Sequence, residues 1–362
     1  MAGYKKYSWL KKTLRFKFPA GTSRGTYTSH DVWYIFTHNA DGAVMGIGEA
    51  APLPGLSPEY SDSFSYEKTL SSLLEKGNKG EELQYADYAD KSSICFGMET
   101  ALKNSYRGSL RLFDNPFTSG MKPIQINGLI WMGSKDLMLQ RIREKIDGGF
   151  RCLKLKVGAI SFEDEIDLLN TIRTHFNPDD LSIRLDANGA FSPETALKKL
   201  SQLSAFNIDS IEQPLPKNSW EQMAKLCGSS PIPIALDEEL TGHYLSTDKG
   251  RLLDIIKPQY IVLKPTLHGG FRGCREWIKL AKERGIGFWM TSALESNIGL
   301  NAIAQFCGSQ EPEVPQGLGT GQIYEKNVPM PCLSLQGDEL FFNPFEAMEN
   351  LDYVKKTIES EI

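Results

Sequence analysis

The sequence predicts an α/β protein built mainly from a closed (β/α) barrel, with a smaller α+β domain ahead of it. The chain has 362 residues, which is more than one typical domain. From Pro123 onward, short β-rich runs alternate seven times with amphipathic helical segments, at a pitch of about 25–30 residues. That many units at a constant pitch favour a closed barrel over an open doubly wound sheet, which remains the rival architecture.

Residues 1–122 read as the α+β domain, because strand patterns come first and helical patterns follow. Period-two alternation predicts strands over 7–18 and 31–52, and the second contains an Asn-Ala-Asp-Gly turn typical of a hairpin. Apolar residues at helical spacing predict helices over 64–76 and 92–106.

Residues 123–328 read as the barrel, and each expected strand is followed by an expected helix. The expected strands cover 124–130, 151–157, 181–187, 208–214, 231–239, 260–265 and 285–292. The expected helices cover 134–149, 161–176, 192–204, 219–228, 247–256, 270–285 and 298–308. Residues 329–362 contain no further strand–helix unit, and we expect them to pack back on the first domain.

Composition excludes several classes of protein. The net charge of −5 leaves no polybasic face for nucleic acid or an anionic membrane. The six cysteines lack the paired spacing of zinc or redox motifs, and their apolar contexts predict buried free thiols in a reducing compartment. No signal peptide and no membrane-spanning run is visible, so the expected location is the cytoplasm. No phosphate-binding glycine motif follows the first barrel strand, so nothing supports nucleotide binding.

Charged residues stand at the carboxyl ends of successive predicted barrel strands. This is the face of such a barrel at which chemistry takes place. The residues come about one strand–helix unit apart, so successive strands from 151–157 onward contribute to the same rim. In chain order they are Lys154 with Lys156, Asp186, Glu212, Asp237, Lys264 and finally the polar Ser292.

The three carboxylates at the rim predict a bound cation. Singly, each would fit a salt bridge across the rim, but three on adjacent strands need a positive charge between them. Oxygen ligands without His or Cys favour a hard ion, Mg²⁺ before Mn²⁺. The expected ligands are Asp186, Glu212 and Asp237. Glu238 should point away from Asp237 by alternation and is expected to pair with a lysine instead.

The lysines on either side of these carboxylates suggest acid–base chemistry. A partly desolvated lysine near other cations has a lowered pKa and can act as a general base. A metal that holds a substrate carboxylate stabilises the enediolate formed when the adjacent carbon loses a proton. The rim therefore predicts proton abstraction α to a carboxylate in a small-molecule substrate.

These residues resemble the enolase superfamily, and within it the muconate-lactonising subgroup. The resemblance covers nearly the whole chain, through the motifs KLK, RLDAN, IEQP, ALDE and LKP in order. It implies a (β/α)₇β barrel of the TIM type with an α+β capping domain. It also implies that Lys156 is the base with Lys154 beside it, that Lys264 lies on the opposite face, and that the three carboxylates bind Mg²⁺.

Within the subgroup, the segments GIGEAAPLPGLSPE, RLDANGAF, TSALESNIGLNAIAQF and GLGTG most resemble the o-succinylbenzoate synthase family. That resemblance implies Mg²⁺-dependent dehydration of 2-succinyl-6-hydroxy-2,4-cyclohexadiene-1-carboxylate in menaquinone biosynthesis. N-acylamino acid racemase and dipeptide epimerase activities share the same residues, although epimerases carry an Asp-x-Asp that is absent from GLGTG. A metal-free Schiff-base lyase is the more distant alternative. The oligomeric state stays open.

Other residues near the strand ends are weaker candidates. Ser292, with the backbone N–H groups of Gly319 and Gly321, is expected to hold the second carboxylate of the substrate. Arg184 either bridges to the site or forms a structural ion pair, and Asn188 either orients an oxygen or shapes a turn. Glu295 is expected to act behind the site by pairing with Lys264. The polar loop 21–25 is either a substrate lid or an ordinary hairpin tip.

Overall fold

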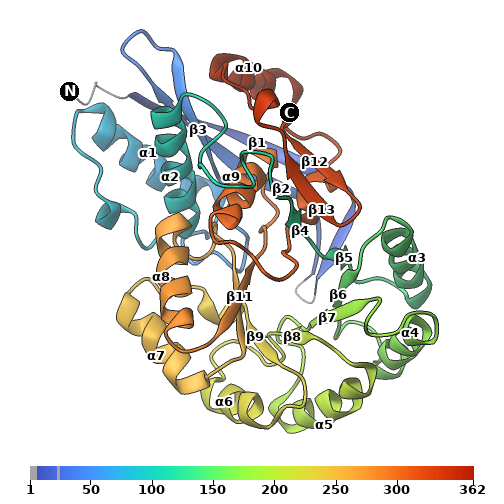
Figure 1. Ribbon diagram of the computed structural model, residues 1–362. Coiled ribbons are helices and arrows are strands. Elements are labelled where there is room, and N and C mark those ends of the chain that lie inside the picture. The colour runs from blue at the N-terminus through green and yellow to red at the C-terminus, as the bar shows by residue number, and fades with distance from the viewer. Residues whose placement is uncertain (1–5, 23–24) are drawn as a thin grey trace.

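The computed structural model describes residues 6–22 and 25–362, so Ser23 and Arg24 of the expected lid lie outside the described residues. A β-sheet with two helices occupies one end of the molecule, and a ring of strands and helices occupies the other (Figure 1). The chain runs from the first of these parts through the second and returns to the first at its C-terminus.

The N-terminal part, called the cap below, is an antiparallel three-stranded sheet covered by two helices. Strand β2 lies between β1 and β3, and the β2–β3 turn contains the expected Asn-Ala-Asp-Gly hairpin. Helix α2 packs closely on β3, where a Cβ on Gly48 would lie 1.9 Å from the backbone oxygen of Gly97. The cap elements are β1 (Lys6–Thr22), β2 (Gly25–His38), β3 (Val44–Ala50), α1 (Ser63–Asn78) and α2 (Ser92–Arg107).

The described residues of the second part form a parallel sheet of seven strands in consecutive order. Residues 316 and 317 close the ring, because Gln316 bridges to Ile126 and Gly317 bridges to Thr291. This eighth segment makes the expected (β/α)₇β barrel. The strands are β5 (Gly128–Ile130), β6 (Cys152–Lys156), β7 (Ser182–Asp186), β8 (Ser210–Glu212), β9 (Ile234–Leu236), β10 (Tyr260–Leu263) and β11 (Gly287–Met290).

The barrel helices lie outside the strands and bury their apolar faces against them (Figure 1). Local signals set several helix starts; Ser134 and Ser161, for example, each accept a backbone N–H of the first turn. The helices are α3 (Lys135–Asp147), α4 (Phe162–His175), α5 (Pro193–Leu203), α6 (Trp220–Ser229), α7 (Ser246–Ile256), α8 (Gly270–Lys282) and α9 (Asn297–Gly308).

The C-terminal segment touches both parts. Its hairpin, β12 (Leu333–Gln336) and β13 (Glu339–Phe342), pairs with β4 (Ile124–Gln125) at the start of the barrel. Helix α10 (Leu351–Glu361) lies against the cap, where Asp352 accepts the backbone N–H of Val44 at 3.1 Å. The hairpin was not apparent from the sequence pattern.

One large hydrophobic cluster is continuous from the cap through the barrel, and a smaller one fills the space between the cap sheet and its helices. All six cysteines are buried free thiols, as the sequence predicted. In the described part of the chain, no helix has the length and apolar character needed to cross a membrane.

Candidate active site

The strand register brings the predicted rim residues side by side. Lys156 is the direct neighbour of Asp186 across β6 and β7, and Asp186 is the direct neighbour of Glu212 across β7 and β8. Asp237 follows the last residue of β9, and Lys264 follows the last residue of β10. Consecutive parallel strands therefore deliver these side chains to one end of the barrel.

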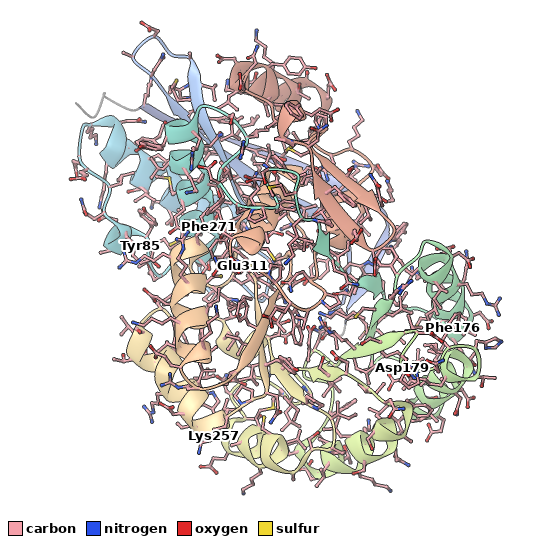
Figure 2. The ribbon with its side chains drawn as sticks, in the orientation of Figure 1. Tyr85, Phe176, Asp179, Lys257, Phe271 and Glu311 are labelled. Atoms are coloured by element: carbon pink, nitrogen blue, oxygen red, sulfur yellow. The ribbon has the colours of Figure 1, made fainter. Side chains whose placement is uncertain are left out.

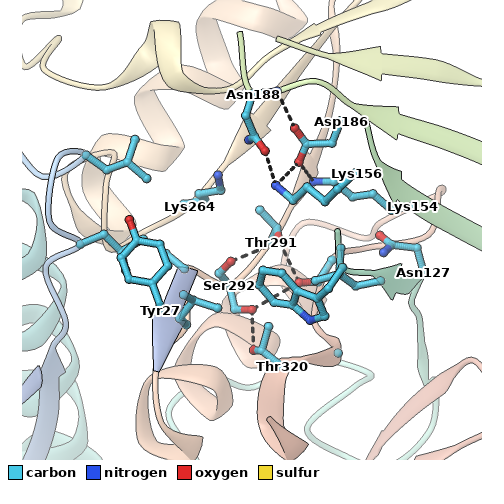
Figure 3. Close-up of a pocket in the computed structure, with 18 of the residues that line it drawn as sticks. Tyr27, Asn127, Lys154, Lys156, Asp186, Asn188, Lys264, Thr291, Ser292 and Thr320 are labelled. Atoms are coloured by element: carbon cyan, nitrogen blue, oxygen red, sulfur yellow. Dashed lines mark hydrogen bonds and ion pairs between the residues drawn. The ribbon is translucent and has the colours of Figure 1, made fainter. Parts of the chain in front are cut away.

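Lysines and carboxylates form one buried network at this end. Lys154 Nζ lies 2.5 Å from Glu212 Oε2 and 3.0 Å from Asp186 Oδ2. Lys156 Nζ lies 2.6 Å from the same Asp186 oxygen. On another side, Lys264 Nζ contacts both carboxylate oxygens of Asp237, at 2.7 and 2.5 Å. Lys264 and Lys156 extend into the pocket from different sides (Figure 3).

Burial and neighbouring charge set the protonation of these groups. Burial, reinforced by the charges of Asp186 and Asp237, raises the pKa of Glu212 to about 7 despite Lys154. Burial also acts to raise the pKa of Asp186, but Lys154 and Lys156 outweigh it and hold that pKa below its usual range. The pKa of Lys264 is raised, because Asp237 and Glu238 outweigh the effect of burial.

The three carboxylates suit a hard divalent cation. Glu212 Oε1 is buried and has no hydrogen-bond partner among the described residues, so an acceptor is left for a ligand. The donor set consists of oxygen atoms, which Mg²⁺ prefers. Within the described ranges, no three His, Cys, Asp or Glu side chains are already grouped as ligands of one ion, and each of the three carboxylates accepts a hydrogen bond from a lysine instead.

A pocket opens beside this network and is lined by both the barrel and the cap (Figure 3). Its charged side consists of Lys154, Lys156, Asp186, Glu238 and Lys264, together with the uncharged Asn188. Its apolar side consists of Tyr27, Leu53, Leu56, Leu129, Trp131 and Leu294. Uncharged polar residues also line it: Ser292 and Thr320 lie at the end away from Asp186, whereas Asn127 lies nearer Lys154 (Figure 3), and Thr291 completes the set. The pocket therefore offers charged groups at one end and an apolar wall with hydroxyls at the other.

Two weaker candidates line the pocket, and one of them contacts the network. Asn188 Oδ1 accepts from Lys156 at 2.7 Å, and its Nδ2 donates to Glu238 Oε1 at 2.9 Å. Its φ of +44° shows that it also shapes the turn after β7, while its role toward a substrate oxygen stays a prediction. Ser292 lines the pocket and shares a 2.6 Å hydrogen bond with Thr320.

The structure shows where three further candidates lie. Arg184 takes the second of its two expected roles, a structural ion pair, and does not bridge to the rim carboxylates: its guanidinium donates to Asp209 Oδ2 at 2.9 Å and to the Pro315 carbonyl, because it lies two residues deeper in β7 than Asp186. Gly321 is not among the residues that line this pocket, whereas Gly319 is, and the role expected for the Gly321 N–H stays a prediction. Glu295 accepts from the hydroxyl of Thr266 and the N–H of Ala293, not from Lys264.

Sequence reasoning missed several lining residues, chiefly Asn127 just before β5, Trp131 just after it, and the two leucines of the cap. Asn127 is 3% exposed, and its Oδ1 has no hydrogen-bond partner among the described residues although it lines the pocket. The Asn127-Gly128 pair, which lies within the strand expected over 124–130 and directly precedes most of β5, was the available signal. The cap leucines could not be found, since only the docking of the cap brings them to the rim.

Comparison with known proteins agrees with this geometry. Residues 137–327 match the family described as enolase C-terminal domain-like. The chain belongs to the enolase superfamily. Members of this superfamily use a divalent metal, typically Mg²⁺. The predicted fold class, a (β/α) barrel with an N-terminal capping domain, is confirmed.

Several relatives share most of the chain. An o-succinylbenzoate synthase from Desulfotalea psychrophila is 44% identical over 89% of this chain and 95% of its own. The crystal structure of MenC from that organism covers 94% of this chain and 100% of its own, with 40% identity and a TM-score of 0.78. A D-Ala-D/L-Ala epimerase from Cytophaga hutchinsonii is 26% identical over 81% of this chain and 80% of its own.

Proposed function

We propose that the protein is a Mg²⁺-dependent o-succinylbenzoate synthase. It would dehydrate 2-succinyl-6-hydroxy-2,4-cyclohexadiene-1-carboxylate to the aromatic product, a step of menaquinone biosynthesis. The observation that carries the proposal is the pocket itself, where lysines enter from different sides beside three adjacent buried carboxylates. The 44% identity to an o-succinylbenzoate synthase over most of the chain supports the substrate assignment.

In this proposal Asp186, Glu212 and Asp237 hold the metal. When bound, Mg²⁺ supplies positive charge that stabilises the enediolate of the substrate carboxylate. A cation held by these carboxylates would take over the neutralising charge, so the lysines that contact them here would be free to face the substrate. Lys154, the most deeply placed of the three lysines, keeps the surrounding potential positive.

The acid–base steps fall to Lys156. Its neutral amine accepts the α proton, and the resulting ammonium then gives that proton to the departing hydroxyl. The C–H and C–O bonds break in turn, and one water leaves with no other reactant consumed. Asn188 orients the Lys156 amine through their 2.7 Å hydrogen bond. The Lys264 ammonium stabilises the negative charge of the enediolate from another side.

The end of the pocket away from the charged residues distinguishes an o-succinylbenzoate synthase from a dipeptide epimerase. A dipeptide substrate brings an ammonium group, which requires a carboxylate partner. Among the described lining residues, the acids are Asp186 and Glu238, and both lie on the charged side. The far end offers hydroxyls and apolar groups that suit a succinyl arm, with Ser292, Thr320 and the Gly319 segment available for its carboxylate.

The test is direct incubation of the purified protein with the cyclohexadiene hydroxy acid. We expect the substrate absorbance to fall in the presence of Mg²⁺, o-succinylbenzoate to form, and EDTA to stop the reaction. A preparation that is folded and loaded with Mg²⁺ but leaves the absorbance unchanged would contradict the proposal. Trapping of a covalent adduct by borohydride, with EDTA-resistant turnover, would point instead to Schiff-base chemistry. The buried free thiols agree with reaction in the reducing cytoplasm.

A further inference from the structure

The turn between β11 and α9 forms one wall of the pocket. Thr291, Ser292, Ala293 and Leu294 all line it. Leu294 has a φ of +66°, a left-handed conformation that a branched residue adopts only when its surroundings hold it there. The contacts on the side of this turn away from the pocket therefore determine the position of this wall.

A carboxylate from the cap holds the end of this turn. Glu49 of β3 is 0% exposed, and its oxygens accept from the backbone N–H of Ser296 at 2.7 Å and of Gly299 at 2.8 Å. One of them also accepts from the Ser296 hydroxyl at 2.6 Å. These N–H groups belong to the first turn of α9, which has no partners of its own for them. An acid here also suits the positive end of the helix dipole.

The space for this contact is set by glycine. A Cβ at Gly299 would lie 3.0 Å from Glu49 Oε2 and 2.6 Å from the Cβ of Glu295. The absence of a side chain at this position therefore lets the cap carboxylate reach the helix backbone. Glu49 has no contact with the lysine–carboxylate network in the interactions described above, so its role toward the reaction is indirect.

A second cap residue holds the middle of the turn. His30 of β2 is buried, with Nδ1 2.9 Å from the carbonyl oxygen of Leu294 and Nε2 3.1 Å from that of Pro52. Leu294 and Leu53, which follows Pro52, both line the pocket. The Tyr324 hydroxyl donates to the same Leu294 carbonyl. His30 thus lies between a pocket-lining segment of the cap and one of the barrel.

We propose that Glu49, assisted by His30, is a positioning residue for the substrate pocket. It fixes the Thr291–Ser296 turn from the cap side and so sets the wall against which the remote arm of the substrate binds. The proposal rests on the proposed function for its substrate. Through Glu49 the cap shapes the binding site, although the Glu49 side chain does not touch the substrate.

The chain offers a matched control for a merely structural role. Glu99 of α2 is also a cap carboxylate at the start of a barrel helix, and it accepts from the backbone N–H groups of Phe271 and Arg272 in α8. Phe271 lies at the junction of α8 with the cap (Figure 2), where its ring centroid is 5.4 Å from that of Phe96 in α2. The first turn of α8 does not line the pocket. Loss of either glutamate should loosen cap docking to a similar degree, but only loss of Glu49 should move the pocket wall.

The experiment compares Glu49→Ala with Glu99→Ala by steady-state kinetics on the cyclohexadiene substrate and by hydrogen–deuterium exchange. We expect E49A to raise KM about tenfold or more with a smaller change in kcat, because the displaced wall contacts the remote arm of the substrate. We expect E99A to keep KM within about twofold. The amides of residues 293–300 should exchange faster in E49A and unchanged in E99A.

Equal changes in KM and in exchange for the two variants would overturn the proposal. If E49A does not fold, the isosteric pair Glu49→Gln and Glu99→Gln is read in the same way, and unchanged kinetics and exchange in E49Q would overturn it. The exchange measurement needs no substrate. A wild-type protein without turnover therefore contradicts the proposed function, whereas wild-type-like exchange over 293–300 in folded E49A contradicts only the positioning role.

Discussion

Replacement of Lys154 by methionine should destabilise the protein strongly in the absence of metal. The lysine is 7% exposed, and its partners Asp186 and Glu212 are both 0% exposed. Methionine fills a similar volume but leaves two buried carboxylates with less compensating charge. Removal of one partner from a buried ion pair costs about 3–5 kcal/mol. For a chain of 362 residues this lowers Tm by about 4–7 °C.

The measurement is thermal unfolding in EDTA at pH 8, with Lys249→Met as the control. Lys249 is also buried and contacts Glu276 at 2.8 Å, but the Glu276 side chain is 31% exposed and stays hydrated when its partner is lost. The control should therefore lose only about 1 kcal/mol. If K154M loses no more stability than K249M, the description of the rim as a tightly coupled charge network is wrong.

Three further outcomes are expected. Burial raises the pKa of Glu99 from its ordinary value to about 7, so its ionisation opposes folding, and stability present at low pH is lost as pH rises from about 4.5 through 7. The Tm of Glu99→Gln minus that of the wild type should therefore grow from pH 5 to pH 8; a difference that is flat with pH would contradict that pKa. Gly48→Ala should lower the free energy of unfolding by about 3 kcal/mol or more, since the added Cβ would meet the Gly97 carbonyl. Gly228→Ala is the control and should cost nothing, because there is open space around Gly228. Equal Tm values for the two variants would refute the close packing of α2 on β3. Finally, millimolar Mg²⁺ should raise the wild-type Tm above its value in EDTA by mass action, and an Asp237→Asn variant should lose that rise.

Strand periodicity was enough to predict the rim of the barrel. Because each strand–helix unit repeats at a similar length, residues at successive strand ends become neighbours in the register. Lys156, Asp186 and Glu212 are direct neighbours for this reason. Their chemistry also followed from residue type, since several buried carboxylates on adjacent strands need a cation nearby. The roles of these residues in the reaction stay predictions.

What the sequence could not predict depends on long-range contacts. Arg184 shares a strand face with Asp186, and alternation shows no more than that. Arg184 lies two residues deeper in the barrel, where its partner is Asp209 rather than a residue of the rim. The barrel closes through the short segment at Gln316, which has no strand pattern of its own. The cap side of the pocket, including Leu53 and the buried Glu49, depends on how the cap docks on the barrel, which the local sequence pattern does not show.

The rate of dehydration by Lys156→Ala, at saturating Mg²⁺, tests the assignment of the base most directly. The variant should keep the Mg²⁺-dependent rise in Tm, because Lys156 is not among the proposed ligands. Its turnover of the cyclohexadiene hydroxy acid should fall by about 10³-fold or more relative to the wild type. If folded, Mg²⁺-responsive K156A keeps turnover within about tenfold of the wild type, Lys156 does not move the proton and the mechanism is wrong.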